Sequence, residues 1–426
     1  MPNEVRACSA ARWSNTEEIM DTNHKEQSAQ PNADDAPTLD RREFLITTAV
    51  AAVGAGTAGL LIPVSARAST KGGPFGQGPF PADGMAAYSP TEPHKLMKLQ
   101  RRALGPKDVA IKIRYCGVCH SDIHTIRGDW GPVQYPQVVG HELAGEVVAI
   151  GASVSKFKIG SRVGVGTMVD SCRHCSECLA GLEQFCENGN TQTYGSKDRD
   201  GSITQGGYST FVVVDEDYII NVPDSLDLAD AGPLMCAGVT VYSPLRRWSI
   251  GPNRKVGIVG LGGLGHIATK LAAAMGAEVT VITTSEDKVS DARRFGAKHV
   301  IVNKDGADLS KYKRSLDFVL DTVPYRHDLD RIVPLLKRDA TLCRVGVGKL
   351  SEPNQFGQMK LVLERNSIAG SVTGGIRETQ EMIDFCAVHK IRPEITKISM
   401  AKIDDAWTKV VAKKARYRFV IDMNGS

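Results

Sequence analysis

The chain has 426 residues, of which 42% are hydrophobic and 6% aromatic, enough to bury a sizeable core and to form two domains with appendages. Its formal net charge of +4 is small for this length, so composition gives no support for a nucleic-acid-binding protein or a basic amphipathic membrane helix. Most of its ten cysteines fall into sets whose spacing favours metal ligation over a disulfide framework, so small-molecule chemistry is the better expectation.

The first 68 residues are predicted to lie outside the folded domains. Residues 1–40 are polar and lack apolar periodicity, so we expect them to be disordered. Asp40-Arg41-Arg42-Glu43-Phe44-Leu45, an uncharged stretch over 44–64 and Ala66-Arg67-Ala68 together resemble a twin-arginine export signal. We therefore expect an exported, periplasmic protein. An uncleaved membrane anchor is one alternative, and a cytoplasmic protein is another if the signal is not used.

A β-rich domain is expected after a Gly/Pro-rich linker over 69–83. It spans 84–234, where short apolar segments punctuated by glycines predict strands near 109–113, 146–151 and 211–214. This domain carries most of the residues that could ligate a metal.

The pattern changes over 235–372 to apolar strands that alternate with amphipathic helices. This alternation predicts βαβ units on a parallel sheet, so the fold class is α/β. The expected strands are 255–259, 279–282, 299–302, 316–320 and 341–345. Residues 373–426, with a helix near 378–389 and a last strand over 418–421, are expected to return to the first domain.

Four closely spaced cysteines predict a closed zinc site. Cys172, Cys175, Cys178 and Cys186 follow the spacing C-x2-C-x2-C-x7-C, which can bring four thiolates around one tetrahedral ion. Such a site has no open position, so its expected role is to hold a lobe that has little core of its own. His174 lies inside the run and is an alternative ligand.

A glycine-rich turn predicts a dinucleotide site. Gly260-Leu261-Gly262-Gly263-Leu264-Gly265 follows the strand 255–259 and precedes a helical stretch over 266–275. In this context Gly260 makes the tight turn, Gly262 lets the backbone approach a pyrophosphate, and Gly265 lets helix and strand pack closely. The helix N-terminus attracts the phosphates.

The residues after the second strand of this unit bear on the choice between NAD and NADP. An NAD site offers a carboxylate to the ribose hydroxyls there, but this chain has Thr283-Thr284-Ser285. Hydroxyl groups can donate hydrogen bonds to a 2′-phosphate, and Lys288 adds positive charge. The acidic Glu286 and Asp287 weaken this inference, so NAD remains the alternative to the favoured NADP(H).

Three further segments carry a family resemblance. Cys116-Gly117-Val118-Cys119-His120-Ser121-Asp122-Ile123-His124, Gly140-His141-Glu142 and Met235-Cys236-Ala237-Gly238 resemble the medium-chain zinc alcohol dehydrogenases, and within them the cinnamyl alcohol dehydrogenase and aldehyde reductase group. Gly128-Asp129-Trp130, Gly206-Gly207-Tyr208-Ser209 and Arg416-Tyr417-Arg418-Phe419-Val420-Ile421-Asp422 match as well. The resemblance covers residues 84–426 and implies a GroES-like catalytic domain followed by a Rossmann domain.

The same resemblance assigns roles at a catalytic zinc. It implies Cys119, His141 and Cys236 as ligands that leave one position open for a substrate oxygen. It gives Asp122 as the carboxylate partner of His141 and places Glu142 near the metal. It also gives Ser121 and His124 as a proton relay. Cys116, nearby, is either a spare thiol or a buried, inert cysteine.

Cofactor contacts follow from the resemblance too. His120 and Arg418 occupy positions that face the cofactor phosphates, although a solvated surface arginine is the alternative for Arg418. Val345-Gly346-Val347 and Ser371 resemble the backbone that flanks the nicotinamide. Trp130 is either a wall of the substrate pocket or a core tryptophan.

The expected activity is zinc-dependent interconversion of primary alcohols and aldehydes, with two zinc ions per subunit and reduction of aryl or medium-chain aldehydes by NADPH. One alternative is an NAD-dependent polyol or formaldehyde dehydrogenase. Another is an exported zinc- and nucleotide-binding protein without turnover. The expected partners are a small-molecule substrate and, as in similar enzymes, a second copy of the chain in a homodimer; no nucleic acid is expected.

Overall fold

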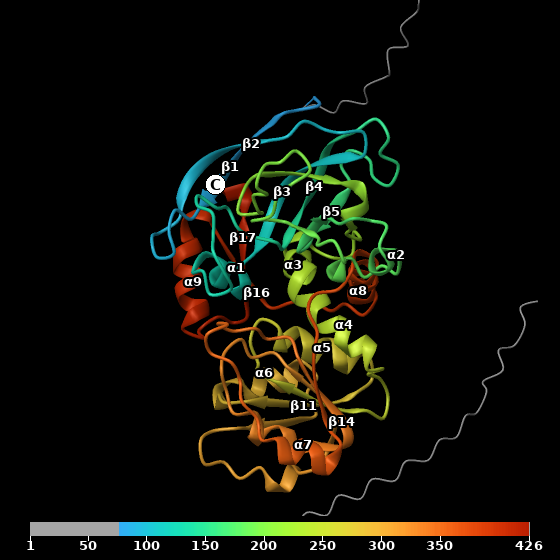
Figure 1. Cartoon of the computed structure of the whole chain (residues 1–426), viewed down its shortest axis with the longest axis vertical. Helices are drawn as coiled ribbons and strands as arrows, with labels where there is room; N and C mark the ends of the chain where they lie inside the picture. Colours follow the sequence, from blue (N-terminus) through green and yellow to red (C-terminus); the bar gives the residue numbers. More distant parts are fainter. Residues whose placement is uncertain (1–75, 426) are drawn as a thin grey trace, which may run out of the picture. The chain divides into compact units, whose positions relative to one another are not determined.

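The structure is a computed structural model that describes residues 76–425 (Figure 1). The disordered segment and export signal predicted for 1–68 lie outside the described residues. No helix within 76–425 combines the length and apolar character needed to cross a bilayer.

The sheet of the catalytic domain contains seven strands within the described residues. Their order is β16 (Ile395–Ile398), β17 (Arg418–Asp422), β3 (Asp108–Gly117), β4 (Leu143–Ile150), β5 (Arg162–Val165) and β9 (Ile220–Asn221), with β8 (Phe211–Asp215) also paired to β3. β16 and β17 run parallel and the other pairs run antiparallel. Two short antiparallel pairs lie beside it: β1 (Phe80–Ala86) with β2 (Lys95–Arg101), and β6 (Met168–Asp170) with β7 (Thr191–Gln192).

The cofactor domain is built on a parallel sheet of six strands among the described residues. Their order is β12 (His299–Val302), β11 (Glu278–Thr283), β10 (Lys255–Val259), β13 (Leu316–Asp321), β14 (Leu336–Arg344) and β15 (Ser367–Gly370). The strand order reverses direction between β10 and β13, and the glycine-rich turn follows β10. In such sheets the ligand binds at the carboxyl ends of the strands beside this reversal.

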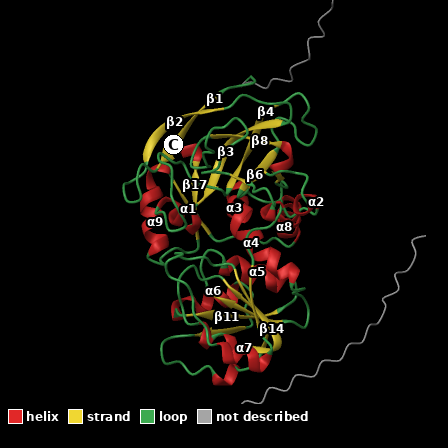
Figure 2. Ribbon diagram, in the orientation of Figure 1, coloured by secondary structure: helices red, strands yellow, loops and turns green. Residues whose placement is uncertain are grey.

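The described helices are α1 (His120–Ile126), α2 (Ser176–Leu179), α3 (Leu228–Pro233), α4 (Val239–Arg247), α5 (Gly265–Ala274), α6 (Val289–Arg294), α7 (Gln358–Glu364), α8 (Ile376–Val388) and α9 (Ile403–Val411) (Figure 2).

Helices cover both faces of the parallel sheet. Leu271 of α5 and Ala292 of α6 share a buried cluster with Ile258 of β10, whereas Leu361 of α7 packs against the opposite cluster, which contains Val259. Because the central strand β10 is buried from Val256 to Val259, it appears in the sequence as a continuous apolar run. The strand candidates matched β10 and the edge strand β12 residue for residue.

Several predicted boundaries differ from the structure. The linker predicted over 69–83 overlaps β1, which begins at Phe80. The strand predicted to start at 341 begins at Leu336, because Leu336 pairs with Leu316 across an irregular stretch in which Asp339 adopts a φ of 66°. The boundary placed between 234 and 235 falls inside a continuous helical run, where a π-helical turn (Leu234–Gly238) joins α3 to α4.

Candidate active site and structural metal centre

A cavity of about 880 Å³ holds most of the predicted site residues. Its walls come from the catalytic domain, including 118–121 and His141, and from the cofactor domain, including 259–264 and 282–285. The glycine-rich turn and the predicted zinc ligands, assigned on separate grounds, therefore line the same space.

Four buried side chains converge beside this cavity, and three of them, Cys119, His141 and Cys236, line it. The ligand atoms of Cys119, His141, Glu142 and Cys236 all lie within 4.8 Å of one another, and all four residues are buried. Cys119 precedes α1, His141 and Glu142 precede β4, and Cys236 lies in the π-helical turn before α4. Two thiols and an imidazole in a buried cluster fit a tetrahedral zinc ion, so the structure brings the predicted ligands together.

The electrostatics of the cluster also suit a cation. The pKa of the Cys119 thiol lies well below its ordinary value, chiefly because Cys236 donates a hydrogen bond to its sulfur. The pKa of Cys236 is raised correspondingly by that same hydrogen bond. The two opposite shifts reflect the close approach of the two sulfurs, as expected of two thiols that would ligate one ion.

Asp122 fixes the orientation of His141. Its Oδ1 lies 3.0 Å from His141 Nδ1, which leaves the other ring nitrogen for a metal. Asp122 also accepts hydrogen bonds from the Cys119 N–H at 3.0 Å, the Gly140 N–H at 3.2 Å and the Tyr208 hydroxyl at 3.0 Å. This carboxylate is therefore fully partnered. Tyr208 had no predicted role, although it belongs to a segment that matched the family.

Glu142 forms a buried ion pair with Arg418. Burial raises the pKa of Glu142 to about 8, with the charge of Arg418 opposing that shift. Its Oε2 has no hydrogen-bond partner within the described residues, and a Cβ on Gly117 would lie 1.9 Å from this oxygen. An unpartnered, buried carboxylate oxygen among thiols is a further sign of a metal site.

The predicted relay residues lie beside the cluster. The Cys119 thiol is 3.5 Å from Ser121 Oγ, and both Ser121 and His124 line the cavity. His124 Nδ1 contacts Asp129 Oδ2 at 2.8 Å, while its buried Nε2 has no protein partner in the described part of the chain. The His120 ring stacks on His124 at 4.7 Å, and burial lowers the pKa of His120 to about 4.

The glycine-rich turn has the shape of a phosphate cradle. Gly260 adopts a φ of 86°, a Cβ on Gly265 would lie 1.9 Å from Gly260 O, and a Cβ on Gly262 would meet nothing within 4 Å. α5 begins at Gly265, so its N-terminus points to this open space. The turn fits a dinucleotide pyrophosphate. Leu264 and Gly263 line the cavity, and a Cβ on Gly263 would lie 2.8 Å from Arg418 atoms.

Arg418 therefore lies between the glycine turn and Glu142. It is 5% exposed, which excludes the alternative of a solvated surface arginine. Its predicted contact with the cofactor phosphates stays a prediction.

The residues that follow β11 differ in burial and in hydrogen bonding. Thr283 is buried and its hydroxyl accepts a hydrogen bond from the Ser285 N–H at 3.2 Å, so it serves the local turn. Thr284 is exposed and Ser285 is half-buried, and all three of these residues line the cavity together with Lys288. Lys288 Nζ donates to Leu261 O at 2.9 Å, and burial lowers its pKa.

The two nearby carboxylates have other partners. Glu286 is 2.8 Å from Lys304 Nζ, and Asp287 is paired with Arg416. Their negative charge is thus partly neutralised. Glu286 and Asp287 should therefore repel a 2′-phosphate beside Lys288 less strongly than the sequence suggested.

The predicted nicotinamide end is formed by two loops. Val345, Gly346, Val347 and Ser371 all line the cavity, although Val347 is 52% exposed. A Cβ on Gly346 would lie 2.4 Å from Val323 O, so this position requires glycine. Trp130 also lines the cavity. It is only half-buried, which fits a pocket wall better than a core tryptophan.

The four-cysteine set forms a second centre. The ligand atoms of Cys172, Cys175, Cys178 and Cys186 lie within 4.8 Å of one another. α2, inside this lobe, contains no buried residue, and Leu179 and Phe185 are exposed. Because the lobe has little apolar core, a bound zinc is the interaction that can hold it. His174 is exposed and its ring contacts Cys172 O at 2.6 Å, outside the cluster.

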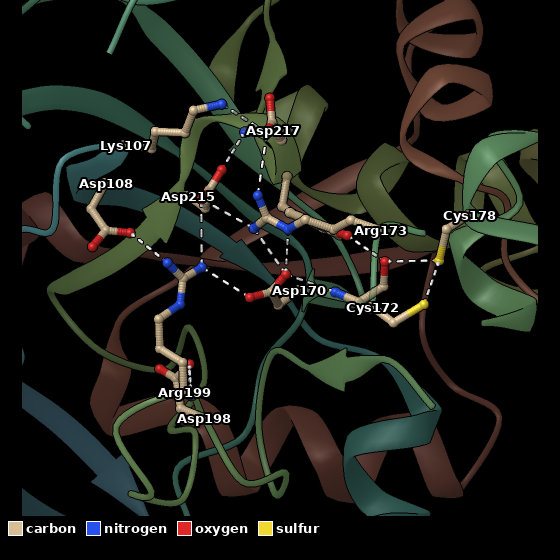
Figure 3. A network of polar contacts seen from close by, with 12 residues as sticks. Lys107, Asp108, Asp170, Cys172, Arg173, Cys178, Asp198, Arg199, Asp215 and Asp217 are labelled. Carbon is tan, nitrogen blue, oxygen red and sulfur yellow. Dashed lines mark hydrogen bonds and ion pairs between the residues drawn. The ribbon is translucent and has the colours of Figure 1, made fainter. Parts of the chain in front are cut away.

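A network of charges attaches this lobe to the catalytic domain (Figure 3). Arg173 contacts Asp170 at 2.8 Å and Asp215 at 3.1 Å, and Arg199 contacts Asp170 at 2.9 Å. Ser171 Oγ lies 3.1 Å from Cys178 Sγ. Arg173 and Asp215, like Arg199 and Asp170, are far apart in the chain and carry no recognisable spacing, so sequence reasoning missed these contacts.

Comparisons with known proteins agree with this geometry. Residues 105–224 match the family model described as alcohol dehydrogenase GroES-like domain, and residues 263–388 match the one described as zinc-binding dehydrogenase. The chain is 50% identical to "NADP-dependent alcohol dehydrogenase C 1" of Mycolicibacterium smegmatis, over 79% of this chain and 96% of the relative. It is 47% identical to "Aldehyde reductase YahK" of Escherichia coli, over 79% and 97%.

Solved structures are similar as well. A cinnamyl alcohol dehydrogenase of Sorghum bicolor matches with a TM-score of 0.78 and 38% identity, over 82% of this chain and 99% of that one. The CAD from Helicobacter pylori complexed with NADP(H) matches with a TM-score of 0.77 and 41% identity, over 81% and 99%.

Proposed function

This chain belongs to the zinc-dependent medium-chain alcohol dehydrogenases, in the group of cinnamyl alcohol dehydrogenases and NADP-dependent aldehyde reductases, and we propose that it acts mainly as an NADPH-dependent reductase of aryl or medium-chain aldehydes. It is an NADP(H)-dependent enzyme that interconverts alcohols and aldehydes and uses zinc. The predicted fold class, a GroES-like domain with a Rossmann domain, is confirmed. The alternative activities are not favoured, since relatives at about 50% identity are NADP-dependent alcohol dehydrogenases.

One observation carries the proposal: the thiol and imidazole cluster and the glycine cradle line one cavity. Bound there, zinc supplies a Lewis acid that polarises the carbonyl and NADPH supplies the hydride. The protein contributes the orientation. Cys119, His141 and Cys236 would hold the metal, Asp122 keeps His141 in the required orientation, and Trp130 limits the space open to the substrate.

The proton is moved by side chains of α1. Reduction of an aldehyde develops negative charge on the carbonyl oxygen, which must gain a proton. Ser121 Oγ, beside the Cys119 thiol, is placed to give that proton. His124 lines the same cavity, its Nε2 has no protein partner in the described chain, and it is the group proposed to resupply the proton.

The preference for NADPH is proposed to depend on Lys288. Replacing it with methionine keeps the side-chain length and removes the charge, which is expected to lower kcat/KM for NADPH by about tenfold to a hundredfold, the usual value of a charge-assisted contact. Activity with NADH should change little, because NADH has no 2′-phosphate. Initial rates with cinnamaldehyde and hexanal measure both.

Lys298→Met is the matched control, since Lys298 is paired with Glu278 at the start of β11 and does not line the cavity. The proposal fails if wild-type protein with full zinc oxidises NADH as well as NADPH, or if Lys288→Met affects both cofactors equally.

We also propose that the chain forms a homodimer through β15. This strand is last in its sheet, and Met359, Val362 and Leu363 expose one apolar face of the adjacent α7, with Val362 71% and Leu363 72% exposed. A second copy related by twofold symmetry would pair with the open edge and cover this face. Light scattering should give twice the chain mass.

The double substitution Val362→Glu and Leu363→Glu is expected to halve that mass. Val388→Glu, at an equally exposed position on α8, should leave it unchanged. A wild-type protein that is monomeric at micromolar concentration would contradict the proposal.

A further inference from the structure

Asp321, the last residue of β13, is a buried carboxylate inside the cofactor domain. Its side chain is fully buried, and its Oδ1 accepts a hydrogen bond from the Val323 N–H at 3.1 Å. Its Oδ2 lies 3.1 Å from His327 Nε2 and 3.3 Å from Arg344 Nε. The side chains of His327 and Arg344 are each 18% exposed. These three residues, the Asp321 cluster, have no part in the proposed reaction.

The Asp321 cluster holds two loops that line the cofactor cavity beside the glycine-rich turn. Arg344 donates hydrogen bonds to Gly346 O at 3.1 Å and to Val323 O at 3.4 Å, which joins one loop to the other. Val323 and His327 lie in the loop after β13, Gly346 lies in the loop after β14, and all three line the cavity. A Cβ on Gly260 would lie 2.9 Å from Val323 Cγ2, so the first loop packs directly on the glycine-rich turn.

The His327 ring has an acceptor beside each of its nitrogens. Nδ1 lies 3.0 Å from Tyr325 O, and Nε2 lies beside the Asp321 carboxylate. Nε2 and Asp321 Oδ2 have no other hydrogen-bond partner among the described residues. A neutral imidazole carries one hydrogen and would turn a lone pair toward one of these oxygens, whereas the protonated ring can donate to both. The contacts of the ring therefore favour the imidazolium.

The balance of charge around the ring points the same way. Burial lowers the pKa of His327, but the hydrogen bond and the charge of Asp321 outweigh burial, so the pKa lies above the ordinary 6.5. Arg344 opposes this shift through its own charge. The other charged residues of the segments around the ring have contacts of their own: Arg326, Asp328, Lys349, Glu352 and Lys413.

We propose that His327 is a proton-sensitive positioning residue for the cofactor. While His327 carries its proton, the Asp321 cluster keeps the loops 322–328 and 345–348 in the arrangement that binds NADP(H). When the proton leaves, a lone pair lies 3.1 Å from the Asp321 carboxylate, and the two loops are held less firmly. Cofactor binding is then tightest at low pH and weakens as His327 loses its proton. This inference depends on the use of NADP(H) and not on which aldehyde is reduced.

The affinity for NADPH as a function of pH gives the first test. For the full-length, zinc-replete protein without aldehyde, nucleotide fluorescence should give a dissociation constant that rises above pH 6.5, by up to about tenfold per pH unit. His327→Gln cannot gain the charge, so it should bind NADPH more weakly than wild type at low pH and change little over the same range. NADH should show the same trend in wild type, which separates the effect from ionisation of the 2′-phosphate.

His299→Gln is the matched control for this titration. His299 Nε2 also lies beside a carboxylate, 3.3 Å from Glu278 Oε1, but His299 is on the edge strand β12 and does not line the cavity. This variant should keep the wild-type affinity and the wild-type pH dependence.

Nitrogen-15 NMR of the protein without cofactor tests the protonation itself. The His327 signals, assigned by their loss in His327→Gln, should show hydrogen on both ring nitrogens at pH 6.5 and should titrate above that value. In Asp321→Asn the midpoint should fall below that of wild type, because the carboxylate that stabilises the charge is gone.

Two results would overturn the inference. One is a neutral His327 ring at pH 6.5 in the wild type. The other is a pH dependence of NADPH binding in His327→Gln that equals that of wild type. Aldehyde turnover enters neither measurement, so both stay decisive if the proposed substrate class is wrong.

Discussion

Replacing Cys119 with alanine should abolish aldehyde reduction and leave the fold intact. The substitution removes one of three buried ligands, so the site should no longer retain zinc, and the carbonyl loses a Lewis acid worth several kcal/mol. We expect kcat to fall by at least about 10³-fold. Metal analysis should show one zinc per chain where the wild type has two. The thermal unfolding midpoint should drop by only a few degrees, as for an ordinary buried substitution.

Cys116→Ala is the matched control for this experiment. Cys116 is also buried and lies three positions earlier, but it is outside the cluster, and burial raises the pKa of its thiol well above the ordinary value. It fits the inert cysteine considered from the sequence. The variant should keep both zinc ions and most of the activity. Full activity in Cys119→Ala, or equal losses in the two variants, would contradict a catalytic metal at this position.

Replacing Cys175 with alanine should chiefly affect stability. Its thiol is one of the four in the closed set. The helix α2 in the surrounding lobe has no buried residue. Structural zinc contributes directly to folding energy, and loss of even several kcal/mol should lower the unfolding midpoint by roughly 5–10 °C in a chain of this size. Proteolysis should then cut first between residues 170 and 190.

Cys386→Ala separates this effect from the loss of any buried cysteine. Cys386 is fully buried on α8 and belongs to neither cluster. Its removal should shift the midpoint by a few degrees without changing the zinc content. If Cys175→Ala unfolds at the same temperature as Cys386→Ala and keeps two zinc ions, the four-cysteine set has no structural role.

The parts that the sequence predicted well are those in which a local pattern reflects a physical constraint. β10 is buried from Val256 to Val259, so an apolar run marks it. The glycines after β10 are required by a left-handed φ and by close backbone contacts, and the four-cysteine spacing is set by one ion. Cys119, His141 and Cys236 lie in separate segments with no common spacing, and only the family resemblance linked them.

The parts that the sequence did not predict depend on contacts between distant segments. Nothing in the order of residues shows that Arg418 pairs with Glu142 or that Arg173 contacts Asp215. The start of β1 was missed because it follows a run of glycines and prolines that is typical of a linker. The local hydrogen bond of Thr283 was also not predicted: its hydroxyl accepts from the Ser285 N–H in its own turn, while the residue lines the cavity.

The most direct test of the account follows the transferred hydrogen. Wild-type protein with full zinc would be given cinnamaldehyde and NADPH carrying deuterium at both hydrogens of nicotinamide C4, and the alcohol would be analysed by mass spectrometry. Because the cradle and the cysteine cluster line one cavity, the account predicts an alcohol with one deuterium on the carbon that was the aldehyde carbonyl. An alcohol without deuterium, or NADPH left unoxidised, would contradict it.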